Sequence, residues 1–336
     1  NTQEADRLLL EVQQKSSDNN EKGFAAYNRF INFIEQRDFG NAFKSYKEAL
    51  KYDKEAYELF DTLKYESEKI LGAGGFGTVF LCSSDIWGRV VVKSLTSPGA
   101  ELNLELLKQE AKALVSIESP WIIKLKDYGG LDIAGGKSPY LVMSWFEGKD
   151  LDTYLKNKGV FKPEKGIQVA KAIAKGMITA HERGIIHRDL KPANILYKEN
   201  ENGFELKIID FGLALRGRGL QEMAMSRKSS SERSIMEESL AGTIKYAPPE
   251  QMGEEVDGKL WKVDKYSDVY AFGRTLKKML FGKLKFKSRL LRQYENQILV
   301  DLISDCEEDN PQERPQDFEE ILSILEQAET FVETAC

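Results

Sequence analysis

The sequence predicts an α+β fold in which a small antiparallel sheet precedes a mainly helical region. Two changes in the spacing of apolar residues predict this order. Helical spacing over residues 21–63 gives way to short β-prone runs, and helical spacing then returns and dominates from residue 151 onward. The β-prone runs lie at residues 65–71, 78–82 and 89–93. A further helix is expected over residues 102–117, and a strand-like pair over residues 195–196 and 206–209.

The first 63 residues are expected to form a helical extension. Residues 41–50 look like part of a tetratricopeptide repeat, but a repeat array needs about three copies to bury its faces. Two interpretations stay open: an extension that packs on the neighbouring domain, and a repeat remnant that binds a partner. In both, these residues dock without taking part in chemistry. The apolar residues at helical spacing are Phe24, Tyr27, Phe30, Ile31, Ile34, Phe43, Tyr46, Ala49, Leu50, Ala56, Leu59, Phe60 and Leu63.

The charge balance and the cysteines exclude several classes of protein. The 336 residues include 48 Lys+Arg and 54 Asp+Glu, and the net charge of −6 argues against a nucleic-acid binder. Cys82, Cys306 and Cys336 are widely spaced and form no CxxC pair, which indicates reduced thiols in a cytoplasmic protein. No run of about 18 apolar residues predicts a membrane segment. The first residue, Asn1, indicates a fragment or a processed product of a longer chain.

A glycine-rich turn joins the first two β-prone runs. Residues 71–79 read Leu-Gly-Ala-Gly-Gly-Phe-Gly-Thr-Val. Glycines in such a turn let backbone N–H groups approach phosphate oxygens. A dinucleotide-binding turn would be followed directly by a helix, whereas a β-prone run follows here. About sixteen residues later Lys93 ends an apolar strand, where on its own it could be an edge residue whose stem lies along apolar surface.

Two later motifs give these features a common meaning. Residues 187–194 read His-Arg-Asp-Leu-Lys-Pro-Ala-Asn, and Asp210-Phe-Gly follows sixteen residues after Asn194. The ordered set resembles the eukaryotic-type Ser/Thr protein kinase family, in a bacterial-like form. The resemblance implies a two-lobed protein kinase fold. Its expected parts are an extension over 1–63, a kinase domain over 64–330 with lobes over 64–143 and 147–330, and a tail over 331–336.

The resemblance also implies a role for each motif residue in phosphoryl transfer from ATP. Lys93 would hold the α- and β-phosphates and would itself be held by Glu110, which faces inward from its helix while Glu101 and Glu105 face solvent. Asn194 and Asp210 would bind Mg²⁺, a hard ion that takes amide and carboxylate oxygens. Asp189 would act as the catalytic base, and Lys191 would neutralise the γ-phosphate. The residues of the turn that would cover ATP are Leu71, Gly72, Gly74, Gly75, Phe76, Gly77 and Val79.

Residues 140–151 resemble the segment that links the two lobes and receives adenine. Met143 falls at its gatekeeper position. The backbone carbonyl of Ser144 and the backbone amide of Phe146 would bind the adenine edge, and the carboxylate of Asp150 would reach the ribose hydroxyls. Ser144 stands where an acid is common, which matters little because main-chain atoms bind the base.

Other residues match scaffold positions of the family. Glu250 of the Ala-Pro-Pro-Glu segment would pair with Arg314, and Asp268 would brace the catalytic loop. His187 would pack and support the Asp-Phe-Gly turn rather than act as a base, and His181 would end a helix. Loss of a buried partner at such positions costs several kcal/mol, so substitutions there should lower activity.

The segment between Asp210 and Glu250 is long and rich in serine. Arg188, directly before the catalytic aspartate, is a ready partner for a phosphate, which brings about −1.5 to −2 of charge at neutral pH. Two interpretations stay open: a disordered insertion without a role, and a segment that autophosphorylation orders. The candidate regulatory hydroxyls are Ser226, Ser229, Ser230, Ser231, Ser234, Ser239 and Thr243. A basic run at Lys283, Lys285, Lys287, Arg289 and Arg292 is interpreted as a solvated helix face rather than a docking site for acidic substrates or nucleic acid.

The expected function is therefore an ATP- and Mg²⁺-dependent serine/threonine protein kinase. Lys191 in the catalytic loop and Thr243 before the substrate platform favour the Ser/Thr branch over the Tyr-specific one, and dual specificity stays open. The alternatives are a small-molecule phosphotransferase of the same fold and a scaffold that binds nucleotide without catalysis. The presence of Lys93, Asp189, Asn194 and Asp210 argues against the scaffold. The expected partners are unidentified protein substrates, with a possible contact through the N-terminal helices.

Overall fold

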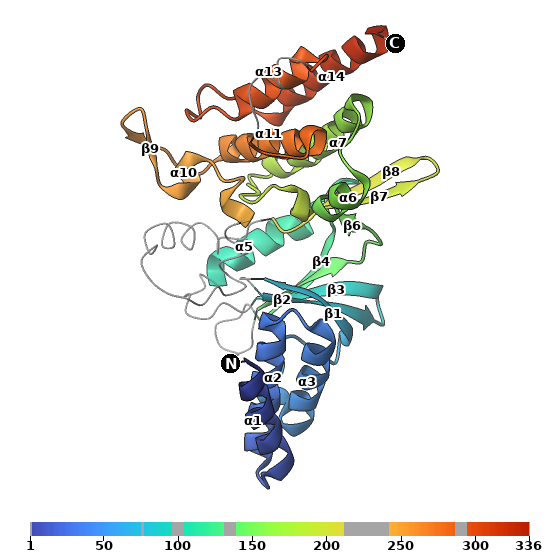
Figure 1. Ribbon diagram of the computed structural model, residues 1–336, viewed down its shortest axis with the longest axis vertical. Coiled ribbons are helices and arrows are strands. Elements are labelled where there is room, and N and C mark those ends of the chain that lie inside the picture. Colours follow the sequence, from blue (N-terminus) through green and yellow to red (C-terminus); the bar gives the residue numbers. More distant parts are fainter. Residues whose placement is uncertain are drawn as a thin grey trace. The chain divides into compact units, whose positions relative to one another are not determined.

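The computed structural model describes residues 2–74, 77–95, 104–130, 139–211, 242–285 and 294–335. It divides into two compact units (Figure 1). Of the described residues, those within 2–111 and 125–145 form the sheet unit, and those within 112–124, 146–211 and 242–335 form the helical unit. Within the described ranges, no helix has the length and apolar character needed to span a membrane.

The N-terminal extension is helical, as the sequence predicts. It comprises α1 (Thr2–Lys15), α2 (Asn19–Glu35), α3 (Phe39–Tyr52) and the short α4 (Lys54–Tyr57). Asp18, Asp38 and Asp53 begin the last three of these helices, because each side chain accepts a hydrogen bond from a backbone N–H of the first turn. Arg29 of α2 binds Asp6 of α1 at 2.7 Å and fastens the first helix to the second.

The sheet unit continues into a five-stranded antiparallel sheet. Its strands are β1 (Glu66–Gly74), β2 (Gly77–Ser84), β3 (Gly88–Ser94), β4 (Leu125–Gly129) and β5 (Tyr140–Ser144), in the order β1-β2-β3-β5-β4. Helix α5 (Leu104–Val115) lies between β3 and β4 in the sequence. The three β-prone runs therefore became strands, and each extends one to three residues beyond the predicted end.

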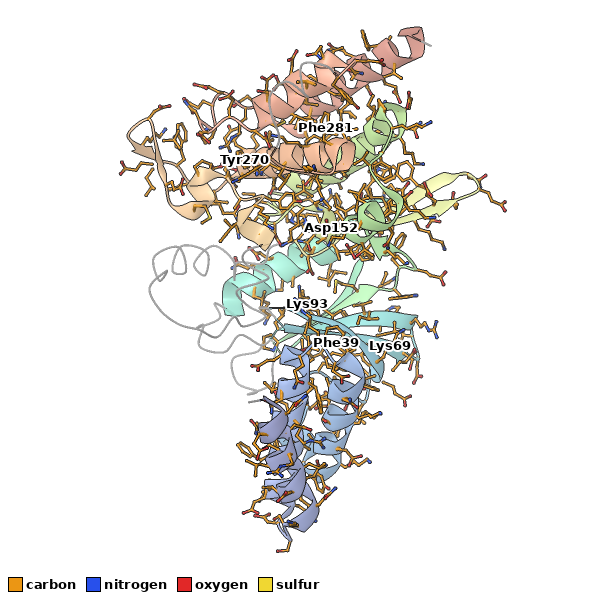
Figure 2. The ribbon with its side chains drawn as sticks, viewed as in Figure 1. Phe39, Lys69, Lys93, Asp152, Tyr270 and Phe281 are labelled. Carbon is orange, nitrogen blue, oxygen red and sulfur yellow. The ribbon has the colours of Figure 1, made fainter. Side chains whose placement is uncertain are left out.

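One aromatic core joins the extension to this sheet. Tyr46 of α3 is fully buried between Phe30 of α2 and Phe80 of β2, with ring centroids 5.4 and 5.3 Å away. Phe60 approaches Phe80 at 5.0 Å from the segment between α4 and β1. Figure 1 shows α2 and α3 ending against the sheet, and Figure 2 places Phe39, at the start of α3, beside it. The extension thus packs on the neighbouring domain, which was the first of the two interpretations.

The helical unit is built around α7 (Pro163–His181), which is buried along much of its length. It packs with α6 (Leu151–Lys158), α11 (Lys265–Phe281), α13 (Gln297–Cys306) and α14 (Phe318–Ala335) in one apolar core. Because α14 runs to Ala335, residues 331–335 continue the last helix instead of forming the expected separate tail.

Two small sheets complete the helical unit. Strands β6 (Lys149–Asp150), β7 (Ile195–Asn200) and β8 (Gly203–Ile208) form one, and β9 (Glu255–Val256) with β10 (Lys259–Leu260) forms the other. The pair β7 and β8 was predicted, and it is longer than the pattern indicated. A one-turn η1 (Pro192–Asn194) precedes β7, and α10 (Pro249–Met252) precedes β9.

The loop after α5 is fastened to β8. The backbone N–H of Ile208 donates to Trp121 O at 2.7 Å, and the N–H of Ile123 donates to Ile208 O at 3.0 Å. Lys207 Nζ also donates to Pro120 O at 2.7 Å. These bonds place residues 112–124 in the helical unit although the sequence assigns them to the smaller lobe.

Candidate active site

The glycine-rich turn of the sheet unit joins β1 to β2. A side chain at Gly77 would put its Cβ 1.7 Å from the backbone oxygen of Ser94, and Gly77 has a φ of +135°. Only glycine therefore fits this position. A Cβ at Gly72 would meet nothing within 4 Å, so this stretch of backbone has open space beside it. Gly75 and Phe76 lie outside the described residues. Leu71, Gly74 and Val79 lie on the flanking strands.

Lys93 lies on β3 opposite Val79 of β2 and Leu141 of β5 (Figure 2). Its exposed fraction is only 8%, which contradicts the picture of a lysine at a solvated strand edge. A buried cation needs nearby anionic or polar groups. Glu110 is half-buried on α5. Met143 and Ser144 end β5, where Met143 is buried.

The catalytic loop of the helical unit joins three predicted residues. Asp189, whose exposed fraction is 4%, accepts a hydrogen bond from Asn194 Nδ2 at 2.7 Å on Oδ2 and pairs with Lys191 Nζ at 2.9 Å on Oδ1. Asn194 Nδ2 also donates to the backbone oxygen of Asp189 at 2.8 Å. Because the amide nitrogen is used in both bonds, the amide oxygen of Asn194 is the atom left for a cation. An amide oxygen and, from Asp210, a carboxylate oxygen are ligands of the kind that Mg²⁺ takes.

Lys191 connects the catalytic loop to the segment that precedes α10. Its Nζ donates to Thr243 Oγ1 at 2.8 Å. Burial lowers the pKa of Lys191 to about 8, and the Asp210 carboxylate opposes this shift. The predicted catalytic-loop residues therefore share one network with Thr243.

Asp268 holds the backbone of the loop. Its Oδ2 accepts from the N–H of His187 and its Oδ1 from the N–H of Arg188, both at 2.8 Å. His181, the last residue of α7, brings Nε2 within 2.8 Å of Asp268 Oδ2. The predicted bracing role of Asp268 is confirmed. The contact of His181 was not predicted, because the two residues lie 87 positions apart in the chain.

Asp210 and Phe211 follow β8 after one intervening residue, Ile209. Asp210 has a φ of +60°, in the left-handed region that residues with a Cβ seldom adopt. His187 supports this turn, since its Nε2 lies 3.0 Å from Ile209 O and its ring centroid lies 4.6 Å from that of Phe211. The predicted packing role of His187 is confirmed.

Glu250 and Arg314 form the predicted buried pair. Arg314 NH1 and NH2 donate to Glu250 Oε1 and Oε2 at 2.7 and 3.0 Å, and both side chains are almost wholly buried. Ser267 Oγ adds a third bond to Glu250 Oε1 at 2.8 Å. A bidentate, fully satisfied pair of this kind fixes the position of α10 on the helical unit.

The expected nucleotide residues of the helical unit lie around β6. Phe146 is buried, and a side chain at Gly148 would put its Cβ 2.3 Å from the Phe146 ring. Asp150 begins α6 by accepting a hydrogen bond from the N–H of Thr153 at 2.8 Å on Oδ1. One oxygen of Asp150 is therefore used as a helix cap, a role that the sequence analysis did not assign.

Most of the serine-rich segment lies outside the described residues. This applies to Ser226, Ser229, Ser230, Ser231, Ser234 and Ser239, and to Lys287, Arg289 and Arg292 of the basic run. Thr243 is described, and its exposed fraction is 4%. Its buried hydroxyl, bonded to Lys191, argues against the expectation that Thr243 accepts a phosphate.

Comparisons with known proteins agree with this geometry. The family model described as protein kinase domain matches residues 65–334. The chain is 33% identical over 231 residues to the serine/threonine-protein kinase pkn2 of Myxococcus xanthus, a match that covers 68% of this chain and 25% of that protein. It is 31% identical over 227 residues to the serine/threonine-protein kinase PknB of Mycobacterium tuberculosis, covering 66% and 33%.

Solved structures show the same fold. The crystal structure of the Mycobacterium tuberculosis PknI kinase domain matches with a TM-score of 0.57 at 20% identity, covering 79% of this chain and 96% of that one. The chain spans about a quarter to a third of the length of the two curated relatives. The family match covers most of the sequence, from the glycine-rich turn to Arg314 and beyond, and the chain belongs to the protein kinase family.

Proposed function

We propose that the chain is a serine/threonine protein kinase that transfers the γ-phosphate of ATP with Mg²⁺. The observation that carries the proposal is the network of Asp189, Lys191, Asn194 and Thr243 in the helical unit. It gathers a carboxylate for the acceptor hydroxyl, a cation for the transferred phosphate and an amide oxygen for the metal, which are the groups that phosphoryl transfer needs.

Each of these residues has its own role in the proposed phosphoryl transfer. Asp189 orients the acceptor hydroxyl and takes its proton, and its carboxylate is held in place by Lys191 and Asn194. Lys191 stabilises charge on the transferred phosphate, while Lys93 and the glycine-rich turn hold the other phosphates. Asn194 and Asp210 would hold Mg²⁺, which would supply positive charge to neutralise the phosphates.

Two contacts favour a protein substrate over the small-molecule alternative. The Lys191–Thr243 bond joins the catalytic loop to the segment that resembles the substrate platform. The Glu250–Arg314 pair anchors the end of that segment. Small-molecule phosphotransferases of this fold usually lack the full activation segment and a pairing like that of Glu250 with Arg314. The protein kinase activity is therefore the better supported of the two.

The proposed metal and phosphate roles are tested with matched pairs of variants. Asp210→Ala is expected to reduce transfer of labelled γ-phosphate by more than about 100-fold, because it removes a metal ligand, whereas Asp152→Ala on α6 should leave it unchanged. Lys93→Met should lose most of the activity, while Lys69→Met, on the exposed part of β1 (Figure 2), should not. Near wild-type transfer by folded Asp210→Ala or Lys93→Met protein would refute these roles.

We also propose that the serines at 226–239 are autophosphorylated and that Arg188 binds a resulting phosphate. The support is the mixture of many hydroxyls with basic residues in this segment and the position of Arg188 beside Asp189. Replacing the six serines with alanine should lower activity on an added protein. Unchanged activity, together with no phosphate in this segment of the wild type by mass spectrometry, would leave the inert insertion as the remaining interpretation.

A further inference from the structure

The peptide that joins Arg188 to Asp189 is clamped at both ends. Arg188 has a φ of +62°, a left-handed conformation that costs free energy for any residue with a Cβ. The oxygen of this peptide accepts a hydrogen bond from Gln251 Nε2 at 2.7 Å. Its N–H donates to His187 Nδ1 at 3.2 Å. The orientation of this peptide determines where the Asp189 side chain points.

The bonds of His187 agree with this arrangement. Because Nδ1 accepts from the N–H of Asp189, the ring proton must be on Nε2, which then donates to Ile209 O. The N–H side of the clamp therefore comes from within the catalytic loop. The oxygen side comes from Gln251, on α10 and 63 residues away in the chain.

Gln251 is placed to act on the loop rather than on solvent. Its exposed fraction is 3%, and its helix is fixed by the neighbouring Glu250 through Arg314. The segment that ends in α10 touches the catalytic loop on both sides of Asp189, through Thr243 on Lys191 and through Gln251 on Arg188. The position of this segment therefore affects the position of Asp189 through two separate contacts.

We propose that Gln251 is a positioning residue that couples the segment ending in α10 to the catalytic base. It holds the strained Arg188 peptide in the one orientation that aims Asp189 at the acceptor hydroxyl. The inference rests on the proposed kinase function. Without the bond, the peptide would relax toward ordinary φ values and the carboxylate would lose its aim, which lowers the rate of transfer more than the binding of ATP.

The test compares wild type with Gln251→Met, which keeps the size of the side chain and removes the donor. With casein as acceptor, kcat is expected to fall about tenfold while KM for ATP stays within twofold. Gln251→Asn, whose amide is one methylene too short to reach, should behave in the same way and serves if the first variant folds poorly. The control is Asn296→Leu, which removes another buried amide-to-backbone bond, to Ala328 O of α14, together with the side-chain cap of α13. It should lower the melting temperature without changing kcat.

Testing Gln251→Met in a second variant, Arg188→Gly, distinguishes a positioning role of Gln251 from a role in packing. Glycine adopts left-handed φ at no cost, so Arg188→Gly removes the strain that the clamp opposes. Arg188→Gly also removes the side chain proposed to bind a phosphate, so the effect of Gln251→Met is measured relative to Arg188→Gly alone. In that background Gln251→Met should reduce kcat by less than threefold. The inference would be overturned if Gln251→Met lowered kcat equally in the wild-type and the Arg188→Gly proteins. It would also be overturned if Gln251→Met lowered kcat in neither protein while the wild type is active. Inactive wild type would instead refute the proposed function.

Discussion

Gly77 is the residue of the glycine-rich turn with the most specific requirement. Its φ of +135° and the 1.7 Å approach of a Cβ to Ser94 O both exclude a side chain. We expect Gly77→Ala to lower the free energy of unfolding by about 2 kcal/mol or more, and Gly72→Ala to change it by no more than about 0.5 kcal/mol. Thermal unfolding of the two variants measures the difference. Equal effects would mean that the turn relaxes around the new methyl group.

Lys191 predicts a dependence of stability on pH. Its pKa in the folded protein is about 8, below the ordinary lysine value of about 10.4. Below pH 8 the lysine is charged in both states and its burial disfavours folding. Between about pH 8 and 10.4 only the unfolded state keeps the proton, so stability rises with pH.

The comparison is between wild type and Lys191→Met without nucleotide. The difference in unfolding free energy, wild type minus variant, should increase by about 2 kcal/mol from pH 7.5 to pH 9.5. Denaturant unfolding at the two pH values measures it. A difference that is constant or falls would contradict the lowered pKa.

Individual residues show which roles could be predicted from the sequence and which could not. Asp268, Glu250 and Arg314 could be assigned because each lies in a recognisable motif, and their bonds are as expected. Gln251 and Ser267 could not, because their partners lie 63 and 17 residues away and no local pattern connects them. The capping role of Asp150 was missed for a different reason. The family resemblance suggested a ligand contact, which hid the ordinary preference of aspartate for a helix start.

At the scale of elements, the N-terminal helices belong to the core of the sheet. Tyr46 is fully buried and also accepts a bond from the N–H of Leu59. We expect Tyr46→Ala to cost about 3–5 kcal/mol of stability, as for other large buried aromatics. Phe24→Ala, at a site that is 63% exposed on the neighbouring helix, should cost no more than about 0.5 kcal/mol. Chemical denaturation of both variants tests this, and a small cost for Tyr46→Ala would show that the extension is only loosely attached.

The periodicity of apolar residues predicted these helices but not where they pack. A stripe at helical spacing shows that a face is covered, and it leaves the identity of the covering surface open. Phe24 and Leu63 belong to the same periodic set as Tyr46, and both are exposed. Helix α1 lies within the predicted helical extension, although the periodic apolar residues that predicted the extension begin only after residue 21. The strands could be located more readily from the sequence, because Gly-rich and polar turns separate them.

At the scale of the whole molecule, the aromatic core that the N-terminal extension shares with the sheet gives the extension a role in stability. Residues 1–60 are not expected to take part in the chemistry. Tyr46 nevertheless packs on Phe80 of the sheet, and Phe30 packs on Tyr46. The extension is therefore needed for a stable sheet unit, and its contribution to activity follows from stability. Sequence alone could divide the chain at residue 63. It could not reveal that the aromatic core crosses that boundary.

The central claim is that Asp189 and its network transfer phosphate to protein hydroxyls. The most direct measurement incubates the full chain with γ-labelled ATP, Mg²⁺ and casein, and identifies the phosphorylated amino acids by mass spectrometry. The account predicts phosphoserine and phosphothreonine without phosphotyrosine. It also predicts a loss of at least about 1000-fold in Asp189→Asn, which keeps the shape of the side chain and removes the base. Wild-type rates in folded Asp189→Asn protein, or no phosphate on casein or on the chain itself with wild type, would contradict it.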